Sequence, residues 1–341
     1  MRNGKREIFM KAIRGEATER PSIACVNQTG TYEQMEALGV KWPDANFDAD
    51  LMARLAIGAH TILDFDAVRV PFCQTIEEEA LGCGVLIGDD KNLPSIATHP
   101  YDIGMTPHFP EDFLDRGRVK VLCKALKKVK EEVGGEVAVM GGVIGPFTIV
   151  GELIGINDFL IATLKNPKML HEFLRVATKA ATQLARALLD AGADAICIED
   201  MLASMDMISP AKYKELAWPW EEELTSRISS APVILHICGR VNPIIKHMIA
   251  TGATALSFEP KTDVTAVKQA IKEEGKQVGI IGGIATMEDL FFGDPEKAKS
   301  SALRAAEEGY NVIAPGCSIP PGTTTETLRA MLLRETEMLG G

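Results

Sequence analysis

The feature that most limits the fold of this chain is a regular alternation of short apolar runs with longer helical patterns. Eight apolar or β-branched runs fall near residues 22–26, 64–70, 136–142, 194–199, 232–238, 254–258, 277–282 and 310–314. Such runs, bounded by turn residues, are typical of buried parallel strands. Eight strand–helix units favour a closed barrel over an open sheet, because closure leaves no edge strand. We therefore predict a (β/α)8 TIM barrel.

The segments between these runs carry the periodicity and the end signals of helices. Several are followed by Ala-Gly or Glu-Gly, a pattern that often ends a helix. The predicted helices include 167–191, 210–229, 242–251, 264–274 and 295–308. Residues 71–117 break this alternation with scattered glycine and proline and little helical period. We expect them to form a loop insertion after the second strand, over one face of the barrel.

Length and composition fit one large enzyme-sized barrel. The chain has 341 residues, and barrels of this kind often use such a length as a single unit, so we expect one domain over 1–341. With 46% hydrophobic and 24% charged residues it can bury a large core. Its net charge of −11 disfavours a nucleic-acid partner, because phosphates would be repelled.

No targeting or membrane segment is predicted. The first seven residues are charged and lack the apolar centre of a secretion signal, and the uncharged run 137–151 is too short to span a bilayer. We therefore expect a cytoplasmic protein without a membrane partner. The seven cysteines lack the dense spacing of a disulfide framework, which favours reduced thiols and possible metal ligands.

The strongest candidate site lies where predicted strands end. Reactive groups of such barrels sit at the carboxyl ends of the strands. His236 and Cys238 close the fifth strand and, two residues apart, point to the same side. Cys317 closes the eighth strand on the same face of the barrel. An imidazole and two thiolates suit zinc, and Glu259, at the end of the sixth strand, is a candidate fourth ligand.

Each of these residues has a simpler interpretation. A lone His-x-Cys in a barrel strand is more often a packing feature than a metal site. Only the addition of Cys317 makes metal ligation as credible as packing. Glu259 is equally compatible with a solvated loop carboxylate, or with an ion pair to Lys261 or Arg240.

Other polar residues at strand ends suggest further roles. Arg69 suits an anionic group of a substrate, or alternatively an ion pair with an acidic neighbour such as Asp200. Glu199 and Asp200 suit orientation of a ligand histidine, proton transfer, or pairing with Arg69. A rival site is the glycine pair 282–283 before a helix, which resembles the phosphate-binding turns of many barrels.

The same residues carry a family resemblance that runs from end to end of the chain. The layout resembles the uroporphyrinogen decarboxylase superfamily and, within it, the zinc-dependent methylcobamide:coenzyme M methyltransferases of methylotrophic methanogenesis. The matching stretches are 11–16 (KAIRGE), 26–30 (VNQTG), 67–71 (AVRVP), 235–242 (LHICGRVN) and 313–317 (IAPGC). The stretch 25–30 lacks the arginines that the decarboxylases use near their first strand for propionate groups, which disfavours porphyrin decarboxylation.

The resemblance implies a zinc enzyme that moves a methyl group from a methylated corrinoid to the thiol of coenzyme M. Methylcobamide would be the methyl donor, carried by a corrinoid protein as the partner. Arg69, Asn27 and Gln28 are candidates to bind the sulfonate of coenzyme M, and Asp200 is a further candidate contact for the substrate. Three alternatives remain: another acceptor, such as homocysteine or tetrahydrofolate; a metal-free lyase of the same superfamily; or a corrinoid-binding protein without catalytic activity.

Overall fold

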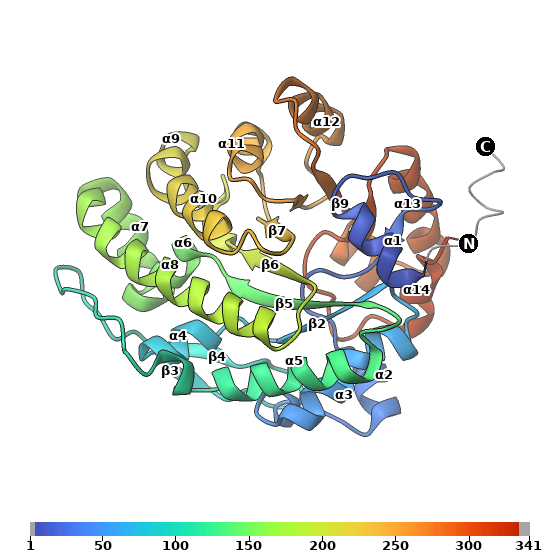
Figure 1. Cartoon of the computed structure of the whole chain (residues 1–341), viewed down its shortest axis with the longest axis horizontal. Coiled ribbons are helices and arrows are strands. Elements are labelled where there is room, and N and C mark those ends of the chain that lie inside the picture. The colour runs from blue at the N-terminus through green and yellow to red at the C-terminus, as the bar shows by residue number, and fades with distance from the viewer. Residues whose placement is uncertain (1–3, 334–341) are drawn as a thin grey trace.

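The computed structural model of the chain describes residues 4–333 and contains an eight-stranded parallel sheet (Figure 1). The order of its strands is β1-β10-β9-β8-β7-β6-β5-β2. Each of the eight predicted runs overlaps one of them, so the prediction of a (β/α)8 barrel is confirmed. The strands are β1 (Ser22–Ile23), β2 (Ala67–Val70), β5 (Ala138–Ile144), β6 (Ala195–Glu199), β7 (Val233–His236), β8 (Ala255–Ser257), β9 (Gly279–Ile284) and β10 (Val312–Pro315).

Asp66 joins the two ends of this strand order. Its backbone N–H donates to the carbonyl of Ile23 at 2.8 Å. Its carboxylate accepts from the Ile23 N–H at 2.9 Å, from the Ser22 hydroxyl at 2.9 Å, and from both terminal nitrogens of Arg20 at 2.7 Å. A side chain therefore supplies part of the bonding that the two-residue strand β1 is too short to provide.

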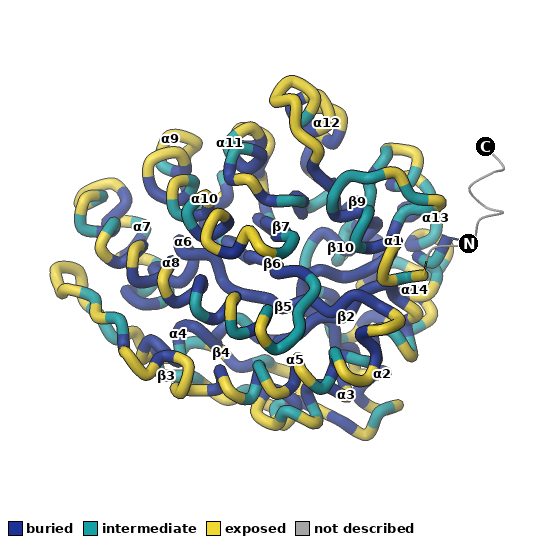
Figure 2. Tube along the Cα trace, viewed as in Figure 1, coloured by how far each residue is buried: buried dark blue, intermediate teal, exposed yellow. Residues whose placement is uncertain are grey.

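Small side chains fill the barrel interior near the amino ends of the strands. Four strands begin with a buried alanine, at positions 67, 138, 195 and 255. Phe9 and Ile13 belong to the same buried cluster, so helix α1 (Lys5–Ala12) and the residue after it close this end of the barrel. The strands are buried, whereas the outer helices expose one face (Figure 2). The polar residues at the ends of the strands therefore lie at the opposite, carboxyl face of the barrel.

The helices surround the sheet and agree with most of the predicted spans. Residues 167–191, 264–274 and 295–308 form α8, α12 and α13 almost to the residue. Further helices follow β1, β2 and β5, and a short helix follows β10. The bounds of all these helices are α2 (Tyr32–Leu38), α3 (Ala49–Thr61), α5 (Val119–Val133), α6 (Pro146–Ile154), α7 (Ile156–Lys165), α8 (Pro167–Asp190), α12 (Val264–Glu273), α13 (Pro295–Glu307) and α14 (Thr325–Ala330).

Two predicted helices are interrupted. Residues 210–229 form α9 (Pro210–Lys212), a π-helical turn (Tyr213–Ala217) and α10 (Trp218–Arg227). Pro219 explains the break, because it has no N–H to donate and its ring clashes with the carbonyl four residues earlier. Residues 242–251 likewise begin as a 3-10 turn (Asn242–Ile244) before α11 (Ile245–Ala250).

The insertion after β2 is more ordered than expected. It contains α4 (Ile76–Leu81) and an antiparallel hairpin of β3 (Gly84–Leu86) and β4 (Ser95–Thr98), both missed in the sequence. The Cys83 thiol contacts the Glu152 carbonyl at 3.6 Å, and the Tyr101 N–H donates to the Leu153 carbonyl at 3.2 Å. The hairpin therefore packs against the end of α6 beside the barrel.

Within residues 4–333, no single helix combines the length and apolarity needed to cross a membrane. Helices α6 and α7 together have sufficient length and apolar composition, but they meet at a bend of 110°. Most of α6 is buried in the protein.

Replacement of Asp66 by alanine tests the closure between β1 and β2. We expect Asp66→Ala to lower the free energy of unfolding by about 3 kcal/mol, because it leaves a buried N–H, a hydroxyl and Arg20 without their acceptor. Asp115→Ala, which removes an exposed ion pair with Lys120, should change it by less than about 0.5 kcal/mol. Urea unfolding measures both, and equal losses would contradict the role of Asp66.

Candidate functional site

His236, Cys238 and Cys317 lie together at the carboxyl face of the barrel. His236 is the last residue of β7, Cys238 follows two residues later, and Cys317 lies two residues beyond the end of β10. One ligand atom from each lies within 4.8 Å of the other two. The imidazole is fully buried, and the two cysteines are partly buried. The structure therefore assembles the trio that the strand ends predicted.

The environment of His236 suits a metal ligand. Its Nδ1 lies 3.0 Å from the hydroxyl of Ser257, at the end of the neighbouring strand β8. Its Nε2 is buried and has no hydrogen-bond partner among the described residues. A hydrogen bond at Nδ1 holds the ring and leaves Nε2 available, which is how metal-binding histidines are commonly oriented. An imidazole nitrogen and two sulfurs at this spacing fit zinc.

The two thiols titrate as a pair. Hydrogen bonding with Cys238 and the nearby imidazole of His236 lower the pKa of Cys317 well below its usual range. The same contact with Cys317, together with burial, raises the pKa of Cys238. The two sulfurs therefore compete for a proton, and a cation between them would replace that proton.

Glu259 lies near the trio but outside it. Its Oε1 accepts from the N–H of Gly239 at 2.7 Å, and its Oε2 lies 3.1 Å from Nζ of Lys261. The ion pair with Lys261 is one of the alternatives that the sequence left open. The carboxylate is nevertheless held against Gly239, the residue that follows Cys238.

Glu199, the last residue of β6, forms the centre of a second polar cluster. It is fully buried, and its oxygens accept from Nδ2 of Asn27 at 2.7 Å and from Nε2 of Gln28 and Gln74 at 3.3 and 2.7 Å. Nη2 of Arg69 lies 3.1 Å from the same carboxylate. Most of the donors that we expected to face a sulfonate are thus directed at a protein carboxylate.

Arg69 is consequently an interior residue with a compensated charge. Its Nη1 donates to the carbonyl of Pro71 at 2.8 Å, and its guanidinium lies so close to Gly142 that a Cβ there would be 2.0 Å from Nη2. Its Nε has no hydrogen-bond partner among the described residues. The acidic neighbour is Glu199, one of the two carboxylates that the sequence offered as partners, and not Asp200.

Asp200 faces away from this cluster and binds the start of α6. Its carboxylate accepts from the N–H groups of Phe147 and Thr148 at 3.2 and 2.7 Å, and from the Thr148 hydroxyl at 2.7 Å. Negative charge at a helix N-terminus is favourable. Burial nevertheless raises the pKa of Asp200 to about 6. These contacts indicate a structural role, in place of the predicted contact with substrate.

A cavity of about 300 Å³ reaches the loop that carries Cys317, although no member of the trio lines it. Gln28 and Ser318 line it from the barrel, and Ser318 directly follows Cys317. Gln74 and residues 93–96 of the insertion, with Glu152, form other walls. The insertion therefore contributes to the carboxyl face, as its position in the sequence predicted.

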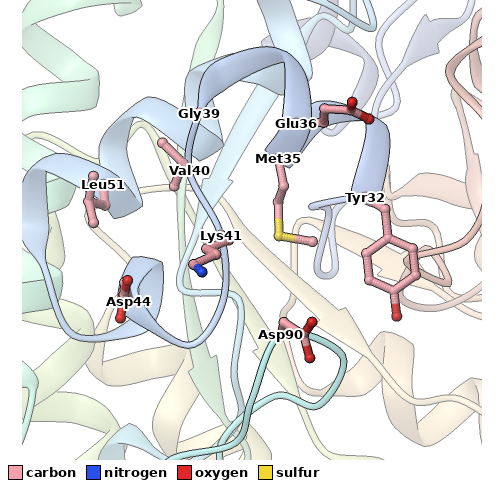
Figure 3. A pocket seen from close by; sticks show the side chains of 9 residues that line it. All are labelled: Tyr32, Met35, Glu36, Gly39, Val40, Lys41, Asp44, Leu51 and Asp90. Atoms are coloured by element: carbon pink, nitrogen blue, oxygen red, sulfur yellow. The ribbon is translucent and has the colours of Figure 1, made fainter.

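A second pocket, of about 470 Å³, lies apart from the trio, between α2 and α3 (Figure 3). Met35, Val40 and Leu51 give it an apolar lining, and Asp90 from the loop of the hairpin faces it. None of the trio lines this pocket, so its shape says nothing about the candidate metal centre.

The glycine pair 282–283 is explained by packing. A Cβ on Gly282 would lie 2.6 Å from the carbonyl oxygen of Phe258, and one on Gly283 would lie 2.5 Å from Cβ of Ala305. The first N–H after the end of β9, that of Ala285, donates to the carboxylate of Asp289 at 2.9 Å. A carboxylate at this turn opposes the binding of a phosphate, which weakens the rival site.

Three polar residues of the site were not singled out in the sequence: Ser257, Gln74 and Glu77. Glu77 is buried and accepts from the N–H of Ile144 at 2.7 Å. Burial, reinforced by the nearby charge of Glu199, raises the pKa of Glu77 to about 7. Its only signal was the acidic run 77–79, which is more typical of a solvated helix face.

Comparison with known proteins identifies the family. A family model described as uroporphyrinogen decarboxylase (URO-D) matches residues 4–335, and the chain belongs to this family. Methylcobamide:CoM methyltransferase MtaA of Methanosarcina barkeri is 34% identical over 331 residues, which cover 96% of each chain. Methylcobamide:CoM methyltransferase MtbA of Methanosarcina mazei is 31% identical over 333 residues, with the same coverage.

Solved structures agree with this assignment. A methyltransferase from Methanosarcina mazei matches with a TM-score of 0.90 and 34% identity, covering 96% of this chain and 97% of that one. A B12-independent methionine synthase from Shewanella sp. W3-18-1 has a TM-score of 0.58 at 12% identity and shows the fold alone. The resemblance inferred from the sequence is confirmed, and with it the assignment of the chain as a methyltransferase.

Glu77→Gln tests the cost of the buried acid next to Glu199. A raised pKa means that ionisation destabilises the folded state as the pH rises from the unfolded value near 4.5 through about 7. The amide oxygen of glutamine still accepts from Ile144 but carries no charge. We expect the variant to gain on the order of 3 kcal/mol in unfolding free energy over wild type between pH 4 and pH 8.

Chemical denaturation of both proteins at these two pH values measures this difference. A difference that is the same at both would show that Glu77 does not titrate in this range.

Proposed function

We propose that this chain uses a zinc ion, held by His236, Cys238 and Cys317, to transfer a methyl group from a methylated corrinoid to the thiol of coenzyme M. The observation that carries the proposal is the trio itself: a buried imidazole nitrogen without a partner and two sulfurs, all within 4.8 Å. The proposed substrates are those of the named relatives, which are 31–34% identical and are methylcobamide:CoM methyltransferases.

The donor set fits the chemistry that the transfer needs. When bound, zinc would act as a Lewis acid that lowers the pKa of the acceptor thiol, so that it is a thiolate at neutral pH. Two cysteinates and a neutral histidine balance the charge of the ion, so the added sulfur keeps its electron density. Ser257 contributes by holding the His236 ring through Nδ1.

The transfer is a single displacement at carbon. The thiolate sulfur attacks the methyl carbon of the corrinoid, the S–C bond forms as the Co–C bond breaks, and the electron pair leaves with cobalt. Cobalt(III) thereby becomes cobalt(I), the product is a thioether, and the leaving group needs no proton. The chain therefore does not need a general acid at this step, and none of the described carboxylates is assigned that role.

The methyl donor approaches from the carboxyl face. Cys238 and Cys317 are partly exposed there, and a corrinoid is too bulky to enter a cavity of about 300 Å³. We propose that a corrinoid protein presents the methyl group at this face while the small thiol lies below it. Glu259, adjacent to Gly239, would occupy the fourth metal position until the thiol arrives, with Lys261 as its alternative partner.

The acceptor's remaining atoms would extend into the cavity beside Ser318. Of the sulfonate contacts predicted from the sequence, Asn27, Gln28 and Arg69 are committed to Glu199, and Arg69 keeps only its Nε without a partner. We therefore propose that Asn27, Gln28 and Arg69 form this wall of the cavity and balance the charge of Glu199. Homocysteine would use the same zinc chemistry and remains the alternative acceptor thiol.

Loss of either sulfur tests the metal centre. We expect Cys238→Ala and Cys317→Ala to reduce bound zinc from about one ion per chain to nearly none, because three protein ligands are the usual minimum of a catalytic site. Cys123→Ala, on the partly exposed face of α5, is the matched control and should keep its zinc. Elemental analysis measures the metal, and full zinc occupancy in both site variants would refute the proposed ligands.

Acceptor choice tests the reaction. Purified protein with zinc should demethylate free methylcobalamin in the presence of coenzyme M, with kcat/KM at least about a hundredfold higher than with homocysteine, a difference of about 2.7 kcal/mol. Absorbance of the corrinoid and mass spectrometry of the thioether measure the two sides of the reaction. Equal rates with both thiols would leave the acceptor assignment wrong, and no transfer to any thiol would refute the function.

A further inference from the structure

We infer that Gln28 is a positioning residue that fixes Cys317 for the metal, and that its amide does not contact the substrate. The inference deepens the proposed zinc site and rests on it. Gln28 lines the cavity that reaches the Cys317 loop, so the sequence and the cavity alone would make it a substrate contact. Its hydrogen bonds, however, all go to other residues of the protein.

Each polar group of Gln28 beyond its own N–H has a protein partner. The side-chain Nε2 donates to Glu199, and Oε1 accepts from the Ser318 hydroxyl. The backbone carbonyl accepts from the N–H of Ile319 at 3.0 Å. With only 6% of its surface exposed, Gln28 offers little to a ligand.

Two of these partners directly follow Cys317. The loop 316–319 lies beyond the last residue of β10, where the ladder of strand hydrogen bonds has ended. Its other backbone tie is the Gly316 N–H, which donates to the carbonyl of Ile284 at 2.8 Å. Gln28 therefore holds the side of the loop beyond the cysteine, and Gly316 holds the side before it.

Glu199 completes the connection. It lies opposite His236 in the register between β6 and β7, and it orients the Gln28 amide so that Oε1 faces Ser318. The carboxylate therefore connects the strand next to one proposed ligand with the loop of another. Residues that orient metal ligands in this way commonly change metal affinity by about 10–100-fold when removed.

The chain offers a matched control. Gln74 also donates to Glu199, at 2.7 Å, and lines the same cavity, but its hydrogen bonds do not reach the loop 316–319. A substitution there removes one amide from the Glu199 cluster and leaves the ties to Cys317 in place.

The test compares Gln28→Leu with Gln74→Leu in the full chain. Zinc affinity is measured by competition with a chelator, and the absorption of the Co²⁺-substituted protein reports the geometry at the two sulfurs. We expect Gln28→Leu to weaken zinc binding by about tenfold or more and to shift the cobalt bands, whereas Gln74→Leu stays within about twofold of wild type. Ser318→Ala, which removes only the hydroxyl donor, should weaken zinc in the same direction and serves if Gln28→Leu does not fold.

The outcomes separate the inference from the proposed function. If wild-type protein binds no zinc, the metal site itself is wrong. If wild type binds zinc and both Gln28→Leu and Ser318→Ala match its affinity and cobalt spectrum, while Gln28→Leu raises the KM for the thiol, Gln28 is a substrate contact and the inference is overturned.

Discussion

The hydrogen-bonded register of the parallel strands determines where every polar group of the site lies. Glu199 is paired in register with His236, and His236 with Ser257, so the ends of β6, β7 and β8 stand side by side. Between β9 and β10, Ile284 is paired with Pro315, which places the Cys317 loop at the same level. A shift of one residue in any pair would turn these side chains to the opposite face of the sheet. Closure at Asp66 therefore matters to the site as well as to stability, because it fixes β1 and the Gln28 loop that follows.

The site combines two charge arrangements with different purposes. At the trio, ionisable sulfurs are held near one another with an unpaired imidazole nitrogen, an arrangement that a divalent cation would stabilise. At Glu199, an arginine and three amides already satisfy the carboxylate, so this wall is compensated without a ligand. A buried ion pair of this kind contributes shape more than net stability. The wall can therefore position the neighbours of the proposed metal centre without placing an uncompensated charge beside it.

The fold and the trio were predictable from sequence because they follow from short-range rules. Apolar runs gave all eight strands, and the two-residue period of a strand placed His236 and Cys238 on one side. The partners of Arg69 were not predictable in the same way. Glu199 and Asp200 are adjacent, and only the point at which β6 ends decides that one faces Arg69 while the other binds α6. The hairpin of the insertion was missed because its strands are half-buried or exposed, so they lack the buried apolar run that marks the barrel strands.

The position of Cys317 shows why a proposed metal ligand beyond a strand end needs support from elsewhere in the chain. Residues 312–313 of β10 are paired with neighbouring strands on both sides, but beyond the Gly316 N–H the ladder of strand hydrogen bonds has ended. The loop would then sample many conformations, and a metal that requires near-tetrahedral geometry would bind with a corresponding entropic cost. Hydrogen bonds from Ser318 and Ile319 to Gln28, and from Tyr32 to Pro321, restrict the loop before any metal arrives. Because all of these partners belong to the segment after β1, the first and last strand ends of the chain act as one unit at the proposed metal centre.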